Sequence, residues 1–572
     1  METLTGVGAS AGIGIGRVMI VEEPSLEYVS HTVTDTEAEK ARFQAAVDAY
    51  IEKTQAEAEA MKETVGEKEA EILTGHILMI SDPGMTGQMT AAIDGGTCAE
   101  DALSQVCDMF ASIFEGSGDE LLMQRATDVR DIKTGILAKL LNKREIDLSK
   151  LPADTVVVTH DLTPSMTAGV KPGGIAGVIT EVGGMTSHSA ILARAMEIPA
   201  ILSIPGVCSK LADGTQVIVN GTLGSVIAEP DEATLAQAEE ARHAFIVQQG
   251  ELKKFIGCAT VTADGIHKEL FANIGKPDDA NQANDKDAEG IGLFRTEFLF
   301  MDSPTVPTED QQFDAYKKTA LIMKGKPVII RTLDIGGDKD VPCLGMEKED
   351  NPFMGFRAIR YCLAREDVYR TQLRALLRAS AFGDIRIMVP LVTCVDEIRQ
   401  VKALVKRYME EFDREGVEYN PDIQVGVMME TPAAALVADL LASEADFFSI
   451  GTNDLTGYTM AADRGNDRVR YLYNTYNPAV LRSIRNIIEC GNAAGIMVGM
   501  CGEAAADPLL IPLWIAFGLG EFSVSATSVL ATRKEVFGWT VEDAKELADR
   551  VMAMSTASEV YEALQAAHDA RI

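Results

Sequence analysis

Eight short apolar segments alternate with helical stretches over the C-terminal half of the chain. They lie at residues 268–275, 289–294, 326–332, 384–390, 423–430, 446–451, 496–501 and 521–526. Apolar runs of this length between longer amphipathic ones indicate buried strands joined by helices. Eight such units in roughly 300 residues predict a TIM (β/α)8 barrel, which we assign to residues 261–572.

The N-terminal half shows a different pattern of apolar residues and glycines. Residues 1–23 are glycine-rich and then strand-like, and further strand-like runs alternate with helical ones between Leu151 and Val219. This alternation predicts an α/β domain formed by residues 1–23 and 146–230. The spacing of Gly6, Gly8 and Ala11 loosely fits a dinucleotide-binding loop. We reject that reading because a strand, not a helix, follows the loop.

Residues 24–145 read as a helical bundle inserted into that domain. The run is rich in Ala, Glu and Lys, and it is broken at Asp82-Pro83-Gly84 and at Asp94-Gly95-Gly96. Proline and glycine at these points are typical of turns between helices. Residues 231–260 continue as a helical segment without a strong apolar stripe, and we predict a helical linker there.

One histidine stands where a glycine-rich loop enters a predicted helix, in Gly183-Gly184-Met185-Thr186-Ser187-His188. Thr186 and Ser187 are good helix-capping residues. Free N–H groups and the dipole at a helix N-terminus favour an anion, and a neutral imidazole is a competent nucleophile. Local chemistry therefore leaves two readings open: a phosphoryl-carrying histidine, or a histidine that only completes a turn.

Polar side chains follow most of the predicted barrel strands, at the end where barrel enzymes carry their chemistry. They are Arg295, Glu297, Arg331, Asp334, Glu430, Asn453, Asp454, Cys501 and Glu503, with Arg357 and Arg464 in connecting loops. Carboxylates suit Mg²⁺, and arginines clamp phosphate and carboxylate groups. The set predicts a site for a small phosphorylated carboxylate together with Mg²⁺.

Two of these positions have more than one possible interpretation. Cys501 is either a small buried apolar residue or a proton donor at the site. The segment Asp334-Ile335-Gly336-Gly337-Asp338 lacks the spacing of a calcium loop, and we read it as a turn.

Composition excludes several classes of protein. The 572 residues carry a formal net charge of −34, which argues against non-specific nucleic-acid binding and suits a basic protein partner. The nine cysteines show no paired metal or redox spacing, so we expect reduced thiols. The sequence shows no signal peptide and no apolar run long enough to cross a bilayer, and we expect a cytoplasmic protein without membrane insertion.

Six segments, in order along the chain, together resemble Enzyme I of the bacterial sugar phosphotransferase system, the phosphoenolpyruvate–protein phosphotransferase family. They start from the His188 loop and continue through the barrel as Gly292–Phe300, Asp334–Lys339, Glu430–Ala434, Phe447–Thr456 and Met500–Glu503. The resemblance implies a cytoplasmic enzyme that moves the phosphoryl group of phosphoenolpyruvate to Nε2 of His188 and then to a histidine of the carrier HPr, leaving pyruvate. This is the first step of sugar uptake.

The same resemblance implies roles for single residues. By position, Glu430 and Asp454 match the Mg²⁺ ligands, and Cys501 matches the acid that protonates the pyruvate enolate. Thr167 and Arg194 match residues that support the histidine. The phosphoenolpyruvate ligands are matched by Arg295, Arg331, Arg357, Asn453, Asp454 and Arg464. The inserted helices would dock HPr, and the barrel would form a homodimer.

Three positions depart from the family pattern, namely Met185, Gly457 and Ala506. None has a proposed contact with substrate or metal. Two rival readings remain in view. Pyruvate phosphate dikinase and phosphoenolpyruvate synthase share these modules but would need an additional nucleotide-grasp domain. A non-catalytic signalling protein would not need the full set of His188, Arg331, Glu430, Asp454 and Cys501.

Overall fold

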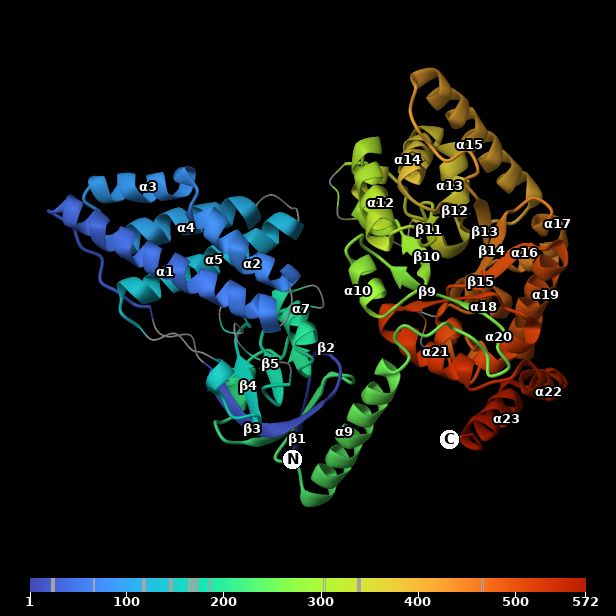
Figure 1. Cartoon of the computed structure of the whole chain (residues 1–572), viewed down its shortest axis with the longest axis horizontal. Helices are drawn as coiled ribbons and strands as arrows, with labels where there is room; N and C mark the ends of the chain where they lie inside the picture. Colours follow the sequence, from blue (N-terminus) through green and yellow to red (C-terminus); the bar gives the residue numbers. More distant parts are fainter. Residues whose placement is uncertain are drawn as a thin grey trace. The chain divides into compact units, whose positions relative to one another are not determined.

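A computed structural model of the chain describes residues 1–571 except 22–25, 65–66, 116–119, 144–147, 163–165, 167–169, 171–172, 185–186, 302, 304, 337–340, 464–465 and 467. The chain forms two compact units, Met1–Gly250 and Glu251–Ile572 (Figure 1). Thr167, Arg464 and Met185 lie outside the described residues, as does the side chain of His188.

The second unit is the predicted barrel. Its eight strands are parallel, and pairing of the last strand with the first closes the sheet. The strands are β9 Glu269–Ile274, β10 Gly290–Arg295, β11 Val328–Arg331, β12 Ile385–Val389, β13 Val425–Met429, β14 Phe447–Ile450, β15 Met497–Met500 and β16 Glu521–Ser525. Each falls within or next to one of the eight apolar segments, so the barrel predicted from their number is confirmed.

Helices surround the strands in the order that a (β/α)8 barrel requires (Figure 1). They are α10 Asp279–Asp285, α11 Glu297–Met301, α12 Glu309–Met323, α13 Ala358–Ala364, α14 Glu366–Ala379, α15 Val395–Glu415, α16 Pro432–Leu436, α17 Ala438–Ala442, α18 Thr452–Met460, α19 Pro478–Ala494, α20 Ile511–Phe517, α21 Val529–Phe537, α22 Val541–Met552 and α23 Ala557–Asp569. The largest apolar core lies between these helices and the strands.

A separate apolar cluster fills part of the barrel interior. It consists of inward-facing residues from six strands and the residue after a seventh: Phe271, Leu293, Ile329, Met388, Met428, Phe447 and Cys501. This interior is a packed layer of side chains rather than an open pore, as in other barrels. The polar residues at the strand ends therefore lie next to a layer of tightly packed apolar side chains.

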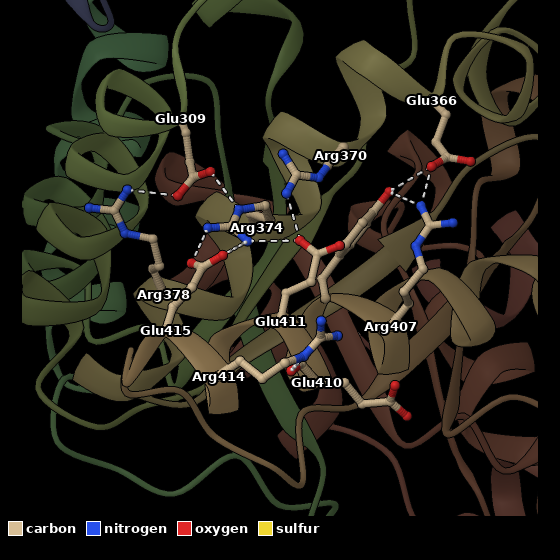
Figure 2. Close-up of polar contacts among 11 residues, drawn as sticks. Glu309, Glu366, Arg370, Arg374, Arg378, Arg407, Glu410, Glu411, Arg414 and Glu415 are labelled. Atoms are coloured by element: carbon tan, nitrogen blue, oxygen red, sulfur yellow. Dashed lines mark hydrogen bonds and ion pairs between the residues drawn. The ribbon is translucent and has the colours of Figure 1, made fainter.

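Ion pairs join three neighbouring helices on the outside of the barrel (Figure 2). Arg374 of α14 contacts Glu309 of α12 at 2.8 Å, and Glu411 and Glu415 of α15 at 3.0 and 2.7 Å. Its guanidinium also lies 4.2 Å from the centre of the Phe412 ring. Arg374 therefore holds the three helices together through both charge and packing.

The first unit contains an eight-stranded mixed sheet, confirming the expected α/β fold class. The strand order is β1-β8-β7-β3-β4-β5-β6-β2. The strands are β1 Glu2–Thr5, β2 Val7–Ser10, β3 Ile13–Val21, β4 Thr155–Thr159, β5 Gly177–Thr180, β6 Ala200–Leu202, β7 Gln216–Asn220 and β8 Ser225–Ala228. Residues 2–21 thus pair with strands that follow the helical part of the chain.

The glycines near the N-terminus serve this sheet. A Cβ atom at Gly14 would clash with the carbonyl oxygen of Ala176, and one at Gly16 would clash with that of Asp154. Only glycine lets β3 pass so close to these backbone groups. Cβ atoms at Gly6 and Gly8, the glycines of the rejected dinucleotide reading, would likewise clash with the carbonyl oxygens of Leu202 and Gly221.

Helices follow β3 along the chain and form a bundle of their own (Figure 1). They are α1 Thr36–Thr64, α2 Glu67–Ile80, α3 Pro83–Asp94, α4 Ala99–Glu115 and α5 Glu120–Leu140, and they share one apolar core. The predicted breaks are present: Asp82 caps α3, which ends at Asp94.

Another helix, α9 Glu232–Lys253, occupies most of the expected linker, and Leu252 is its one buried residue. Within the described residues, no helix meets the length and apolarity that a bilayer span needs.

Candidate active site

Arginines end two neighbouring strands at the same edge of the barrel. Arg295 ends β10 and Arg331 ends β11, and the two are paired in register. Arg295 is exposed, whereas the side chain of Arg331 is only 12% exposed. Adjacent guanidinium groups at this end of a barrel can grip the oxygens of one phosphate or carboxylate.

Asp334 joins Arg331 to Arg357. One of its oxygens lies 3.0 Å from Nη1 of Arg331, and the other accepts hydrogen bonds from Arg357 Nε and Nη2 at 3.1 and 2.6 Å. Arg331 also pairs with the buried carboxylate of Glu297. The two arginines, far apart in sequence, are thereby held in one cluster with little freedom to move.

Glu430 follows β13 and is 2% exposed. Its Oε1 accepts a 2.6 Å hydrogen bond from the backbone N–H of Leu391, a residue held at a φ of 57°. A Cβ atom at position 451 would lie 2.8 Å from Oε2, so Gly451 leaves the room that this carboxyl occupies. A strained backbone and a required glycine are features typical of functional sites.

Asp454 and Asn453 lie in the first turn of α18, directly after β14. Asp454 approaches Nη2 of Arg357 at 3.6 Å. Asn453 exchanges hydrogen bonds with Glu503, through its Nδ2 at 3.2 Å and its Oδ1 at 3.1 Å. The short helix therefore presents both side chains at the strand-end face, next to the arginine cluster.

Negative charge is in excess in this cluster. Burial, reinforced by the nearby carboxylates of Asp454 and Asp334, raises the pKa of Glu430 well above its ordinary value. Counted as ionised, the five carboxylates of this face (Glu297, Asp334, Glu430, Asp454 and Glu503) exceed the three guanidinium groups (Arg295, Arg331 and Arg357), which leaves a balance of −2. A divalent cation would neutralise that balance, so the donor set fits Mg²⁺.

The described residues contain no group of three or more acidic, histidine or cysteine side chains arranged as a complete metal cage. Two carboxylates are enough for Mg²⁺, because this ion usually completes its shell with water and substrate oxygens. Glu430 and Asp454 offer only carboxylate oxygens, which are the protein ligands that Mg²⁺ prefers.

Cys501 follows β15 and faces the barrel interior, where it is 4% exposed. Burial raises the pKa of its thiol to about 11, with Arg331 opposing the rise and Glu430 adding to it. A neutral thiol beneath the arginine and carboxylate cluster can give up a proton. Such burial is common to a small apolar residue and to a proton donor.

A pocket of about 680 Å³ opens beside Asn453 and Asp454. Its other walls include Phe353, Leu391 and Tyr458. The Tyr458 hydroxyl donates a hydrogen bond to the carbonyl of Phe353 and accepts one from Nη1 of Arg357 at 3.4 Å. Gly457 borders this space, and a Cβ atom there would make only ordinary contacts, 3.4 Å from the Ala462 oxygen.

The loop that carries His188 belongs to the first unit. His188 is the first residue of α7, His188–Ala195, and Ser187 caps this helix by accepting a 3.3 Å hydrogen bond from the N–H of Ala190. Gly183 has a φ of 109°, which favours glycine. The predicted entry of a glycine loop into a helix is confirmed. Arg194, on the same helix, donates to the carbonyl of Ala9 at 3.4 Å.

Comparison with known proteins places this geometry in a family. Sequence models of the PEP-utilising enzymes match the chain in three parts: the N-terminal part over residues 5–125, the mobile domain over 151–224 and the PEP-binding domain over 249–540. A phosphoenolpyruvate-protein phosphotransferase of Bacillus sp. (strain S) is 47% identical across 98% of this chain and 97% of its own. The chain belongs to the phosphoenolpyruvate–protein phosphotransferase family.

Two further similar proteins illustrate the range of the comparison. The phosphoenolpyruvate-protein phosphotransferase of Bacillus subtilis (strain 168) is 43% identical over 98% of both chains. A solution structure of an Enzyme I protein is 35% identical, covering 42% of this chain and 99% of its own, with a TM-score of 0.39. Among the matched regions, the mobile domain contains His188 and the PEP-binding domain contains every strand-end residue named above.

The structure brings Arg295, Arg331, Arg357, Glu430, Asp454 and Cys501 to one end of the barrel, with Asn453 beside them. Sequence patterns left Glu297 and Asp334 without a role, and Asp334 was read as part of a turn. Both are buried and neutralise the arginines. Their position directly after strands was the available signal. Tyr458 and the N–H of Leu391 gave no sequence signal.

Proposed function

We propose that the protein transfers the phosphoryl group of phosphoenolpyruvate to its own His188 and then to a histidine of the carrier protein HPr, releasing pyruvate. The observation that best supports this function is a buried cluster in a chain of this family. The cluster consists of Arg331, Asp334, Arg357 and Glu430. Phosphoryl transfer depends mainly on positioning and charge neutralisation, and this cluster supplies both. The acceptor histidine lies on the separate mobile domain.

In this proposal the barrel residues hold the substrate. Arg295, Arg331 and Arg357 grip the phosphate and carboxylate of phosphoenolpyruvate. Asn453 and Arg464 add polar contacts. Asp334 and Glu297 keep the arginine side chains in place before substrate arrives. Such prior positioning lowers the entropy lost when the substrate binds.

Glu430 and Asp454 are the proposed ligands of Mg²⁺. When bound, the ion would neutralise charge on the phosphoryl oxygens. Burial first, and then the neighbouring carboxylates, raise the pKa of Glu430, and a bound cation would oppose that rise.

His188 receives the phosphoryl group through Nε2. Its place at the start of α7 puts free backbone N–H groups and the helix dipole near the phosphate that it would carry. Thr167 and Arg194 are the proposed supporting residues. Cys501 is the proposed acid that protonates the pyruvate enolate at carbon, because its thiol is neutral until it meets a strong base.

The remaining partners follow the family pattern. We propose that the bundle α1–α5 docks HPr and that two copies of the protein associate through the barrel. The net charge of −34 would favour encounter with a basic carrier. The division into residues 1–23 with 146–230, 24–145, 231–260 and 261–572 is part of the same proposal, as is a cytoplasmic location.

Incubation with ³²P-labelled phosphoenolpyruvate and Mg²⁺ tests this function. We expect acid-labile label on the wild type, transfer to added HPr, and no label on His188→Ala. His160→Ala is a matched control, because this exposed histidine lies in the same unit and pairs with Glu181 at 2.9 Å. Retained label on His188→Ala would refute the acceptor. Labelling from ATP without phosphoenolpyruvate would favour a dikinase instead.

A further inference from the structure

A carboxyl group is buried inside the barrel, below the strand-end cluster. Glu521 begins β16 and is 0% exposed. Glycines on two other strands make room for it and for its partner Ser523: a Cβ atom at Gly499 of β15 would clash with Oε2 of Glu521, and one at Gly292 of β10 would clash with Ser523 Oγ and lie 2.9 Å from Oε1 of Glu521. Three strands thus form a cradle that a carboxyl group fills.

One half of this carboxyl group is satisfied and the other is not. Ser523 donates a hydrogen bond from Oγ to Oε1. Oε2 is buried and has no hydrogen-bond partner among the described residues. Buried polar atoms without a protein partner usually bind an ordered water molecule. The free oxygen lies over Gly499, on the strand that leads to Cys501.

The charges that face Glu521 do not neutralise it. Glu269 is its neighbour in register on β9, and Arg386 of β12 lies within electrostatic range. Arg386 is occupied by Asp384 at 2.8 Å. Burial raises the pKa of Glu521 to about 8, with Glu269 adding to the rise, and Ser523 and Arg386 opposing it. The group therefore holds a proton at neutral pH.

Polar atoms connect this carboxyl to the loop that carries Cys501. Gly499 and Cys501 are two residues apart and point to the same side of β15. Asn273 of β9 donates from Nδ2 to the carbonyl oxygens of Cys501 and Ser523, at 3.1 and 3.2 Å. The Oδ1 of Asn273 is also buried without a partner. Asn273 thus bonds to the residue that carries the thiol and to the residue that bonds Glu521, and the thiol itself contacts Ser449 and lies within electrostatic range of Glu521.

We propose that Glu521 is a proton reservoir that restores the Cys501 thiol from inside the barrel. This inference rests on the proposed role of Cys501. In the forward direction the S–H bond breaks and a C–H bond forms on the enolate, giving pyruvate and a thiolate. The O–H bond of Glu521 then breaks and the S–H bond reforms, through water bound at Oε2. The carboxylate regains its proton from solvent.

The proposed proton route predicts different effects on two isotope measurements, the exchange of carbon label and the entry of solvent deuterium. Labelled pyruvate exchanges into phosphoenolpyruvate by repeated forward and reverse half-reactions. A thiolate left by one turnover can take its proton back from the next pyruvate, so carbon exchange needs no outside proton. Solvent deuterium enters the methyl group only if the thiol is restored from solvent between turnovers. A reservoir therefore controls deuterium entry more than carbon exchange.

The experiment measures both in D₂O, with the full chain, Mg²⁺, phosphoenolpyruvate and ¹⁴C-pyruvate. For Glu521→Gln we expect carbon exchange within about twofold of the wild type, and a fall of about tenfold or more in deuterium incorporated per exchange. In the wild type, deuterium entry should decline as pH rises above about 8, and the variant should lack that limb.

Three further variants make every outcome decisive. Glu521→Asp should recover part of the deuterium entry. Glu269→Gln, at the in-register neighbour, should keep deuterium entry at neutral pH but move its decline to lower pH, because Glu269 adds to the rise in the pKa of Glu521. Ser523→Ala should lower it if Glu521→Gln fails to fold. A wild-type deuterium ratio in Glu521→Gln, or a parallel loss of both isotopes, would overturn the reservoir. Full carbon exchange in Cys501→Ala would instead refute the proposed role of Cys501.

Discussion

At the scale of single residues, Asp334 allows two arginine side chains to be buried side by side at the end of the barrel. Its two oxygens contact Arg331 and Arg357, and it is 3% exposed. Without it, two guanidinium groups would be buried together with less compensation, which is costly. The arginines are thus held ready for an anionic substrate without collapsing onto Glu430.

Glu521 gives a prediction about stability and pH. Its folded pKa of about 8 exceeds the ordinary value of 4.5, so the folded chain binds this proton more tightly. That stabilisation is complete below about pH 4.5 and is lost as pH rises towards 8. Relative to Glu521→Gln, the free energy of unfolding of the wild type should therefore fall by about 1 kcal/mol per pH unit across this window.

Urea unfolding of the two proteins at several pH values between 5 and 8 measures this difference. Glu562→Gln, at an exposed position on α23, is the control and should give a constant offset from the wild type. A pH-independent difference between the wild type and Glu521→Gln would show that the carboxyl is already ionised in the folded chain.

At the scale of elements, the Tyr458 hydroxyl joins α18 to the loop before α13, in addition to the contact between Asp454 and Arg357. Tyr458 of α18 bonds both to the Phe353 carbonyl and to Arg357. Burial raises the pKa of this phenol to about 12, so the hydroxyl stays protonated and can donate. The helix that presents Asn453 and Asp454 is in this way tied to the loop that carries Arg357.

Tyr458→Phe should loosen Arg357 without removing any substrate contact. We expect KM for phosphoenolpyruvate to rise roughly tenfold, with a smaller change in kcat. A hydrogen bond to a charged group is worth about 1.5–3 kcal/mol, and this one is long at 3.4 Å, so its loss should lie at the lower end. Steady-state kinetics with HPr as acceptor give both constants. Tyr471→Phe, at a position 78% exposed, should behave as the wild type. An unchanged KM would remove Tyr458 from this positioning role.

The charge network around Arg374 predicts how the outer helices are stabilised (Figure 2). Arg374→Ala leaves three glutamates of α12 and α15 without their shared partner, and it removes packing over Phe412. We expect a loss of about 1–3 kcal/mol in the free energy of unfolding, smaller at high salt. Arg399→Ala breaks a more exposed pair with Glu444 and should cost under about 1 kcal/mol. Equal costs would contradict a special role for Arg374.

At the scale of the whole molecule, the chemistry is divided between two compact units. The substrate cluster belongs to Glu251–Ile572 and His188 belongs to Met1–Gly250. α9 crosses the boundary and is exposed along most of its length. One histidine that serves both a small substrate and a carrier protein needs such a connection to reach both.

This division predicts the behaviour of separated units. Fragment 1–250 should not be phosphorylated by phosphoenolpyruvate alone, and fragment 251–572 should bind phosphoenolpyruvate without becoming labelled. Mixing them should restore slow labelling of the first fragment, because the covalent link no longer raises the effective concentration. Labelling and circular dichroism of each fragment provide the readout and the folding control. Self-labelling of either fragment would contradict the division.

Sequence patterns were sufficient for the barrel because most of its strands are short apolar runs followed by a polar residue, as Val425–Met429 is followed by Glu430. They also placed Glu430 and Asp454 at one edge, since parallel strands share their carboxyl ends. They placed Asp334 at the same edge but did not predict its role, because that role depends on Arg357, which lies 23 residues further along the chain. The N–H of Leu391 and the cradle around Glu521 likewise arise from packing between strands.

The central claim is that phosphoryl from phosphoenolpyruvate is carried by His188. Peptide mapping by tandem mass spectrometry at neutral to basic pH, after brief exposure of the wild type to phosphoenolpyruvate and Mg²⁺, tests it most directly. We predict a phosphoryl group on the peptide that contains His188, assigned to its imidazole and absent when Mg²⁺ is removed. A phosphoryl group on any other residue, with His188 unmodified, would contradict the account.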